Sequence, residues 1–168
     1  MSPQPTGRFA HRPDGLYLLL DRLFVAPIED VWYSLTNPHQ MEKWIGTYTG
    51  QPATGGVKFR MTSEPESEWE YVTILECAAP HRFLVESREG IEKMRVFCHL
   101  TEAGGMTTLT LGQRLHESKD AATMGPGWDY YLDRLVASRA GHPLPEWEHY
   151  YPAHSGYYRE LVIPAKSA

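Results

Sequence analysis

The chain has 168 residues and a formal net charge of −5, and its composition is that of an ordinary globular protein. This length is enough for one domain with a hydrophobic core that needs no disulfide or structural metal. The acidic balance argues against binding nucleic acid through its phosphates. No apolar run reaches the roughly 18 residues of a membrane helix, so we expect a cytoplasmic protein without membrane insertion.

Residues 1–46 predict an arm, a strand and two short helices. Residues 1–14 are rich in proline and polar side chains, which predicts a flexible N-terminal arm. Aromatic and branched side chains fill residues 16–25, which predicts a strand. Apolar residues then recur at helical spacing over 27–36, after a proline that suits the first position of a helix.

A sharp corner is expected after this helix. Asn37 and Pro38 are a typical N-cap and first residue of a second short helix, which ends before Gly46. Gln40 stands three residues after the cap, where its side chain can return a hydrogen bond to the backbone of Asn37.

Residues 47–115 predict an antiparallel meander of strands. Turn residues punctuate it at 54–56, 64–65, 79–80, 89–90 and 103–105. Apolar and polar residues alternate in most of its strands, so one face of the sheet should be covered. Within 69–77 the apolar residues change parity, which indicates a bulge or a segment covered on both faces. Cys77 and Cys98 lie in these strands without metal-ligand spacing and are expected to be buried, reduced thiols.

The C-terminal part predicts one long helix and a docked tail. Residues 126–140 follow the 3.6-residue period and end at a glycine, with Asp129 on the polar side. The tail over 142–168 is rich in aromatic residues and can hold a short helix at about 154–161. The expected organisation is an arm over 1–14, a ligand-binding domain over 15–141 and a tail docked on the same domain.

This order of elements resembles the helix-grip fold, an α+β fold in which a curved antiparallel sheet wraps around a long C-terminal helix. The sequence also carries a succession of short motifs, each of them weak alone. They are Ala26-Pro27 with Val31-Trp32, Leu35-Thr36-Asn37-Pro38, Trp44-Ile45-Gly46, Gly55-Gly56 with Phe59, Leu75-Glu76 with Pro80 and Phe83, Leu109-Thr110-Leu111, and Gly127-Trp128 with Leu132-Asp133-Arg134-Leu135. Over residues 16–141 they resemble the activator of Hsp90 ATPase homologue family of the START-like, or SRPBCC, superfamily.

The resemblance implies a hydrophobic cavity between the sheet and the long helix. The strand and helix spacing predicts which side chains line it, although the same spacing is typical of a plain core. The apolar and aromatic candidates are Trp44, Phe59, Phe83, Val96, Leu109, Leu111, Trp128, Tyr131, Leu132 and Leu135. Tyr71, Ser87 and Gln113 are polar side chains that the alternation can turn inward, where they would orient a ligand or hold buried water.

Other chemical constellations are weak. His142, His149 and His154 accompany Glu146 and Glu148 in the tail, but at no recognised metal-ligand spacing, so a solvated tail is preferred. No Ser or Cys has the context of a nucleophile, and the glycine pairs lack the phosphate-loop pattern. A group of Glu residues over 64–70 predicts a solvated strand face. Arg82, Arg88 and Arg95 fit surface salt bridges better than a clamp for an anion. No catalytic residue, cofactor or metal is therefore assigned.

Three functions remain open. We expect first a protein that binds an apolar or aromatic small molecule. The second is a cyclase-like or hydrolase-like enzyme acting on a polyketide-type substrate, with Tyr71, Gln113 or Tyr131 assisting by hydrogen bonding. The third is a cochaperone-like protein-interaction module or a homodimer that uses the exposed sheet face or the aromatic tail. We expect one departure from the eukaryotic cochaperone pattern, namely the lack of a second domain for Hsp90 binding.

Overall fold

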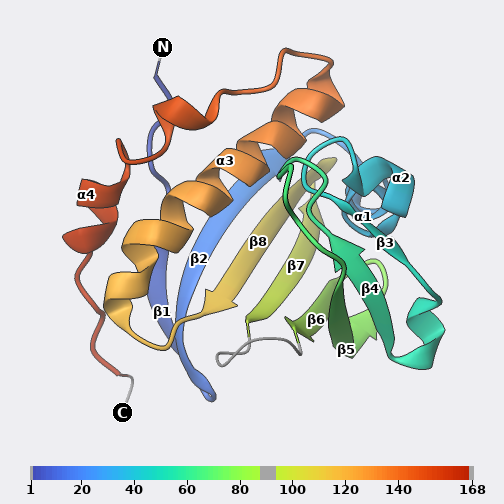
Figure 1. Ribbon diagram of the computed structural model, residues 1–168, viewed down its shortest axis with the longest axis horizontal. Coiled ribbons are helices and arrows are strands. Elements are labelled where there is room, and N and C mark those ends of the chain that lie inside the picture. The colour runs from blue at the N-terminus through green and yellow to red at the C-terminus, as the bar shows by residue number, and fades with distance from the viewer. Residues whose placement is uncertain (1, 88–93, 167–168) are drawn as a thin grey trace. The chain divides into compact units, whose positions relative to one another are not determined.

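The structure is a computed structural model that describes residues 2–87 and 94–166. An eight-stranded antiparallel sheet has the order β1-β2-β8-β7-β6-β5-β4-β3, and the long helix α3 follows it in the chain (Figure 1). This confirms the predicted α+β class and the succession of strand, two short helices, meander and long helix. The expected turn at 89–90 lies outside the described residues.

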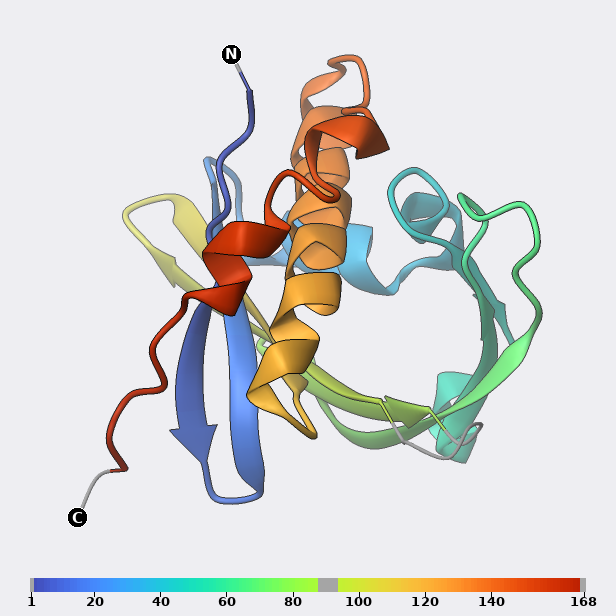
Figure 2. The ribbon, with the colours of Figure 1, turned by 60° about the vertical axis from the view of Figure 1, so that its left-hand side comes forward.

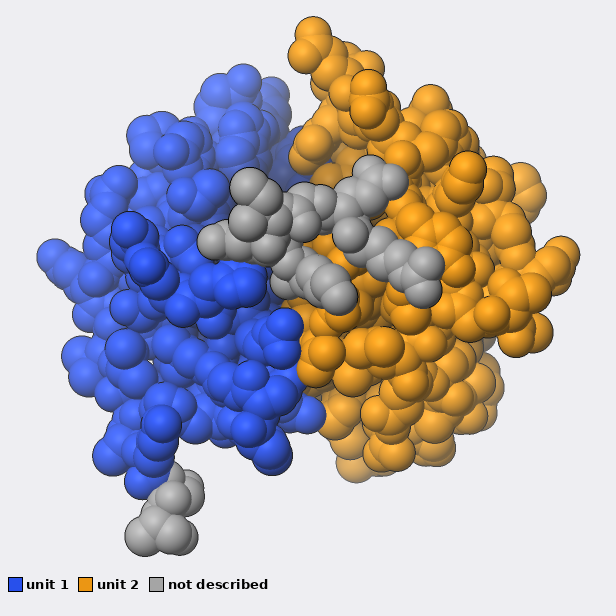
Figure 3. Space-filling model, turned by 60° about the horizontal axis from the view of Figure 1, so that its bottom comes forward, with its two compact units in different colours: residues 1–21, 111–168 blue, residues 22–110 orange. Residues whose placement is uncertain are grey.

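The chain divides into two compact units (Figure 3). Unit 1 comprises residues 1–21 and 111–168, and unit 2 comprises residues 22–110. Unit 1 therefore contains both ends of the chain, whereas unit 2 is the continuous middle. The strand β8, Met106–Arg114, contributes residues to both units.

Unit 2 contains the two short helices. The helix α1, Ile28–Thr36, has nearly the predicted bounds, with Val31 and Leu35 buried. The helix α2, Pro38–Met41, begins as predicted, because the Asn37 side chain accepts hydrogen bonds from the backbone of His39 and Gln40. It is shorter than expected and continues only as turns towards Gly46. The Asn37 N–H already donates to Tyr33 O at the end of α1, and the Gln40 side chain accepts from Lys43 Nζ instead.

The meander of unit 2 consists of five strands that are neighbours in the sheet order. They are β3, Thr47–Thr49; β4, Gly56–Arg60; β5, Glu70–Ala78; β6, Arg82–Ser87; and β7, Arg95–Ala103. The register between β5 and β6 shifts between Ile74 and Glu76, which confirms a bulge as the reason for the change of parity. Leu75 stands at this shift and is 45% exposed.

Two expectations for these strands were incomplete or wrong. Phe97 of β7 is buried beside Cys98, so buried and exposed positions do not alternate strictly in this strand. Cys77, expected to be buried, is exposed beyond the bulge of β5, while Cys98 is buried. Burial raises the pKa of the Cys98 thiol.

Unit 1 contains β1, Arg8–Arg12, and most of β2, Gly15–Phe24, together with α3, Ala121–Ala140, and α4, Ser155–Arg159. The strand β1 forms inside the segment expected as an arm, because it pairs with β2 in antiparallel register from Arg8↔Leu19 to Arg12↔Gly15. The arm before β1 and the helix α4 both lie beside α3 (Figure 2). The short helix α4 was predicted at this place.

The long helix begins earlier than predicted. Proline favours the first turn of a helix, which placed the start at Pro126, yet α3 begins at Ala121 and contains Pro126. A proline inside a helix leaves the carbonyl four residues earlier without its usual donor. Here that carbonyl belongs to Ala122, and Ser155 Oγ of the tail donates to it at 2.9 Å.

Candidate functional site

The predicted lining residues are divided between the two units. Unit 2 holds Trp44, Phe59, Tyr71, Phe83, Val96 and Leu109. Unit 1 holds Leu111, Gln113, Trp128, Tyr131, Leu132 and Leu135.

In unit 1, the predicted residues of α3 form one side of the helix. Trp128, Tyr131, Leu132 and Leu135 follow the helical period, and the rings of Trp128 and Tyr131 meet edge to face with centroids 6.5 Å apart. Leu132 and Leu135 are fully buried, and the side chain of Leu111 in β8 is 2% exposed. This part of the predicted lining is therefore strongly apolar.

Gln113 of β8 is the polar residue among this apolar set. Its side chain is only 1% exposed. The amide oxygen accepts a hydrogen bond from Trp128 Nε1, and the amide nitrogen donates to the sulfur of Met124. The strand β8 and the first half of α3 are thus joined by a buried amide.

In unit 2, the predicted lining residues Trp44, Phe83 and Tyr71 each make a different kind of contact. Trp44 is buried and donates its indole N–H to Ser34 O at 2.9 Å. Phe83 meets Trp32 of α1 edge to face, with ring centroids 5.8 Å apart. Tyr71 lies over Gly56 of the neighbouring strand so closely that a Cβ there would stand 2.2 Å from its hydroxyl oxygen. Only glycine fits beneath this ring.

The remaining polar candidate of unit 2, Ser87 at the end of β6, is buried. Its hydroxyl accepts a hydrogen bond from Met94 N at 3.1 Å. Arg82 pairs with Glu76, and Arg95 pairs with Glu86 at 2.7 Å. Both arginines thus take part in the salt bridges that the sequence favoured, whereas Arg88 lies outside the described residues.

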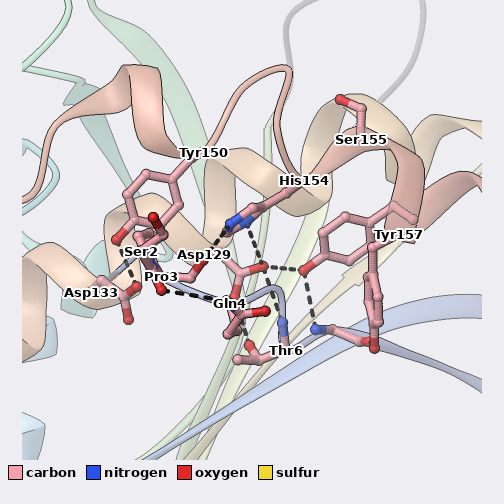
Figure 4. A network of polar contacts seen from close by, with 12 residues as sticks. Ser2, Pro3, Gln4, Thr6, Asp129, Asp133, Tyr150, His154, Ser155 and Tyr157 are labelled. Atoms are coloured by element: carbon pink, nitrogen blue, oxygen red, sulfur yellow. Dashed lines mark hydrogen bonds and ion pairs between the residues drawn. The ribbon is translucent and has the colours of Figure 1, made fainter.

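The structure also reveals a polar cluster around a buried aspartate that the sequence did not predict. We call it the Asp129 cluster, and it consists of Tyr158 together with Thr6, Asp129 and His154, which Figure 4 labels. The Asp129 carboxylate is fully buried and accepts from Thr6 Oγ1 at 2.6 Å, from Thr6 N at 3.3 Å and from the Tyr158 hydroxyl. The Tyr158 oxygen in turn accepts from Gly7 N at 3.1 Å.

His154 completes this cluster from the tail. The preference for a solvated tail was wrong at this residue, which is 4% exposed because its ring enters the space between the arm and α3. Its Nε2 lies 3.0 Å from Pro3 O, and since a carbonyl oxygen only accepts, Nε2 carries the hydrogen. Within the described residues, Nδ1 has no hydrogen-bond partner and lies 3.8 Å from Asp129 Oδ2.

Tyr158 is the central member of the Asp129 cluster. Its ring fits against two glycines, because a Cβ on either Gly7 or Gly125 would stand 2.5 Å from a ring carbon. Burial raises the pKa of the Tyr158 hydroxyl, and the charge of Asp129 and the hydrogen bond to it raise it further. The tyrosine is therefore held as a neutral donor that fastens the arm and the tail to α3.

A weak signal for the cluster is present in the sequence. Asp129 stands among aromatic residues on a helix that also contains two glycines and a proline near its start. Single-helix periodicity assigns such an aspartate to the polar side. Its partners Thr6 and Tyr158 are 123 and 29 positions away, so no local pattern connects them.

Comparisons with known proteins agree with this fold. The family model for activator of Hsp90 ATPase homolog 1-like protein matches residues 25–138. The crystal structure of CalU16 from Micromonospora echinospora is similar, with a TM-score of 0.74 and 23% identity over 94% of this chain and 96% of that one. The protein encoded by gene BPP1335 of Bordetella parapertussis gives a TM-score of 0.70 and 22% identity over 98% and 96% of the two chains.

A third structural neighbour is DynU16, which its description places in the dynemicin biosynthetic locus. It gives a TM-score of 0.64 and 19% identity over 81% of this chain and 50% of that one. No curated protein matches the chain. Among residues 2–87 and 94–166, no helix is long and apolar enough to cross a membrane.

Proposed function

The chain belongs to the family of activator of Hsp90 ATPase homolog 1-like proteins, and on this premise we propose that it binds an apolar or aromatic small molecule. The helix-grip fold of this family commonly holds hydrophobic ligands. The observation that carries the proposal is the row of Tyr131, Leu132 and Leu135 on α3 together with the buried amide of Gln113. An apolar lining with a few placed polar groups is the usual composition of a small-molecule site.

Two further points support this ligand class. The candidate residues of unit 1 are aromatic or aliphatic apart from Gln113, which favours a ligand without a formal charge. DynU16 is placed by its description in a biosynthetic locus, which supports a ligand that is itself a product or intermediate of small-molecule biosynthesis. The enzymatic alternative adds catalysis on such a compound, in which Tyr71, Gln113 or Tyr131 assists by hydrogen bonding.

A thermal-shift experiment tests the proposal. Naphthalene, 2-acetylnaphthalene and anthraquinone are added in excess, and binding to the folded state alone raises the melting temperature. Leu135→Trp is expected to abolish the shift, because the larger ring occupies ligand space. Val136→Trp is the matched control, since Val136 is the next residue of α3 and 37% exposed, and it should keep the shift.

The result that contradicts the proposal is a melting temperature of the unaltered chain that none of these compounds changes. Far-UV circular dichroism shows whether Leu135→Trp retains its helices and strands. If that variant is unfolded, Leu132→Met serves in its place. This volume-conserving change keeps the fold and is expected to alter the relative affinities of the three compounds.

A second candidate function, self-association through the tail, is supported by a separate observation. Trp147 and Tyr151 are 39% and 41% exposed, and their rings stack with centroids 5.7 Å apart. Exposed aromatic pairs are frequent anchors of interfaces. Light scattering of the unaltered chain and of Trp147→Ala tests it, and a monomer in both samples rejects it. The point variant is preferable to a chain ending at Gly141, because the missing tail would also remove Ser155 and Tyr158 from α3.

A further inference from the structure

The amide of Gln113 has a fixed orientation. The indole Nε1 of Trp128 is a donor only, so the atom of the amide that faces it must be the oxygen. The amide nitrogen, with its two hydrogens, then points to the other side. This assignment depends on the chemistry of the partner and removes the usual ambiguity between the two ends of a glutamine.

The donor end of this amide is poorly satisfied. Its partner is the thioether sulfur of Met124, which is a weak acceptor. The side chain is 1% exposed, so bulk water does not compensate. Amides buried for purely structural reasons usually pair with oxygen, because a buried donor without a good acceptor costs about 1–3 kcal/mol.

Met124 is a partner that can leave. Its side chain is unbranched and flexible, and the residue is only half-buried at the start of α3. When its sulfur moves away, no polar group of Met124 is left unpaired. An oxygen acceptor that arrives at the Gln113 nitrogen therefore replaces a weak bond by a stronger one.

We propose that Gln113 selects ligands that present a carbonyl or similar uncharged oxygen acceptor on an aromatic framework, such as aromatic ketones and quinones. This inference rests on the proposed function and names the ligand class of the same site. Trp128 acts as the positioning residue, since its indole holds the amide oxygen and so directs the amide nitrogen. The ligand oxygen accepts from Gln113 Nε2, and Met124 gives way.

The test compares two ligands of nearly equal shape. 2-Acetylnaphthalene and 2-isopropenylnaphthalene differ mainly in whether an oxygen or a methylene group stands on the side chain. Their dissociation constants are measured by fluorescence titration with the unaltered chain and with Gln113→Met, which keeps the length of the side chain but has no donor. The ratio of the two constants is expected to shift by about tenfold against the ketone in this variant, which corresponds to one good hydrogen bond.

Two further variants serve as controls. Gln51→Met makes the same chemical change at an exposed glutamine outside the predicted lining and should leave the ratio unaltered. Met124→Leu removes the competing sulfur, so it should keep or increase the preference for the ketone. If Gln113→Met does not fold, the side-chain amide resonances of Gln113 in the unaltered chain give the same answer, because the ketone should move them and the hydrocarbon should not.

The outcomes separate the two proposals. If both compounds bind, the ratio is equal in all variants and the two compounds affect the Gln113 resonances alike, the selection by Gln113 is overturned while small-molecule binding stands. If neither compound binds to the unaltered chain, the proposed function fails and the inference fails with it. A ketone preference that depends on Gln113 supports both.

Discussion

The carboxylate of Asp129 is costly to bury and is stabilised by donors from two distant parts of the chain. Thr6 supplies a hydroxyl and a backbone N–H, and Tyr158 supplies a second hydroxyl. Charged acceptors make stronger hydrogen bonds than neutral ones. Each of these donors therefore contributes to the stability of unit 1, and removal of one leaves the charge less well compensated.

Tyr158→Phe is expected to lower the free energy of unfolding by about 1–3 kcal/mol, because Asp129 loses a donor and Gly7 N loses its acceptor. Urea denaturation at neutral pH measures this. Tyr33→Phe is the control, since Tyr33 is 53% exposed and should give less than about 0.5 kcal/mol. Equal stability of Tyr158→Phe and the unaltered chain would show that the cluster does not hold the tail.

The same residue predicts a dependence on alkaline pH. The pKa of Tyr158 is raised in the folded state by burial and by Asp129, whereas in the unfolded chain it is about 10. The stability from this neutral hydroxyl is thus fully present below pH of about 10 and is lost as the pH rises towards the folded-state pKa. Urea midpoints above pH 10 should fall more steeply for the unaltered chain than for Tyr158→Phe. Parallel curves would contradict this.

At the scale of elements, α3 depends on the tail for its first turns. Pro126 has no N–H, so it cannot donate to Ala122 O as other residues of a helix would. Ala122 is buried, and without another donor its carbonyl would stay unsatisfied. Ser155 Oγ supplies that donor, and the Tyr158 ring fills the space left by the absent side chain of Gly125. The helix α4 is therefore docked where Pro126 interrupts the backbone hydrogen bonds of α3.

Ser155→Ala is expected to destabilise the chain by about 1–2 kcal/mol, because the Ala122 carbonyl is left unsatisfied. Hydrogen exchange should also become faster in residues 121–126 than in the second half of α3. Ser138→Ala is a useful comparison: its hydroxyl also donates to a carbonyl of α3, that of Leu135 at 3.0 Å, but without a proline nearby. If the two variants are equally stable, the proline break needs no support from the tail.

The sequence predicted those elements whose signals are local. The start of α2 follows from Asn37 and Pro38, and the bulge of β5 is one of the two interpretations that the change of parity allowed. The strand β1 and the first turns of α3 could not be predicted, because β1 pairs with β2 and the carbonyl freed by Pro126 is bonded by the distant Ser155. Phe97 is buried beside Cys98 in β7, which strict alternation along the strand does not predict.

The candidate site was predictable only in part. Spacing turned Gln113, Leu111 and four α3 residues inward, and the structure buries all of them except Trp128, which is half-buried. The partners of Gln113 could not be derived, since no sequence pattern joins its amide to Trp128 and Met124 across a strand and a helix. The Asp129 cluster was beyond reach because its members lie at both ends of the chain.

At the scale of the whole molecule, the two chain ends form one unit and the middle forms the other. Residues 2–7 supply Pro3, Thr6 and Gly7 to His154, Asp129 and Tyr158. The arm is short, yet it contacts both α3 and the tail. It should therefore matter more to stability than its length indicates.

Deletion of residues 2–7 is expected to lower the free energy of unfolding by roughly twice the effect of Thr6→Ala, because the deletion also removes the partners of His154 and Tyr158. Thermal and urea denaturation measure both variants. Gln4→Ala is the control, as this exposed side chain donates to the neighbouring Ser2 O at 3.4 Å. A deletion no more harmful than Thr6→Ala would show that the other arm contacts add little.

The contact between Gly7 and Tyr158 has a consequence for the synthesis of the protein on the ribosome. The two residues are 151 positions apart in the chain. The arm emerges from the exit tunnel long before Asp129, His154 and Tyr158 are translated, so it lacks these partners until then. Nascent chains halted before residue 129 should be cut by proteases within residues 2–7, whereas the released protein should resist cleavage there.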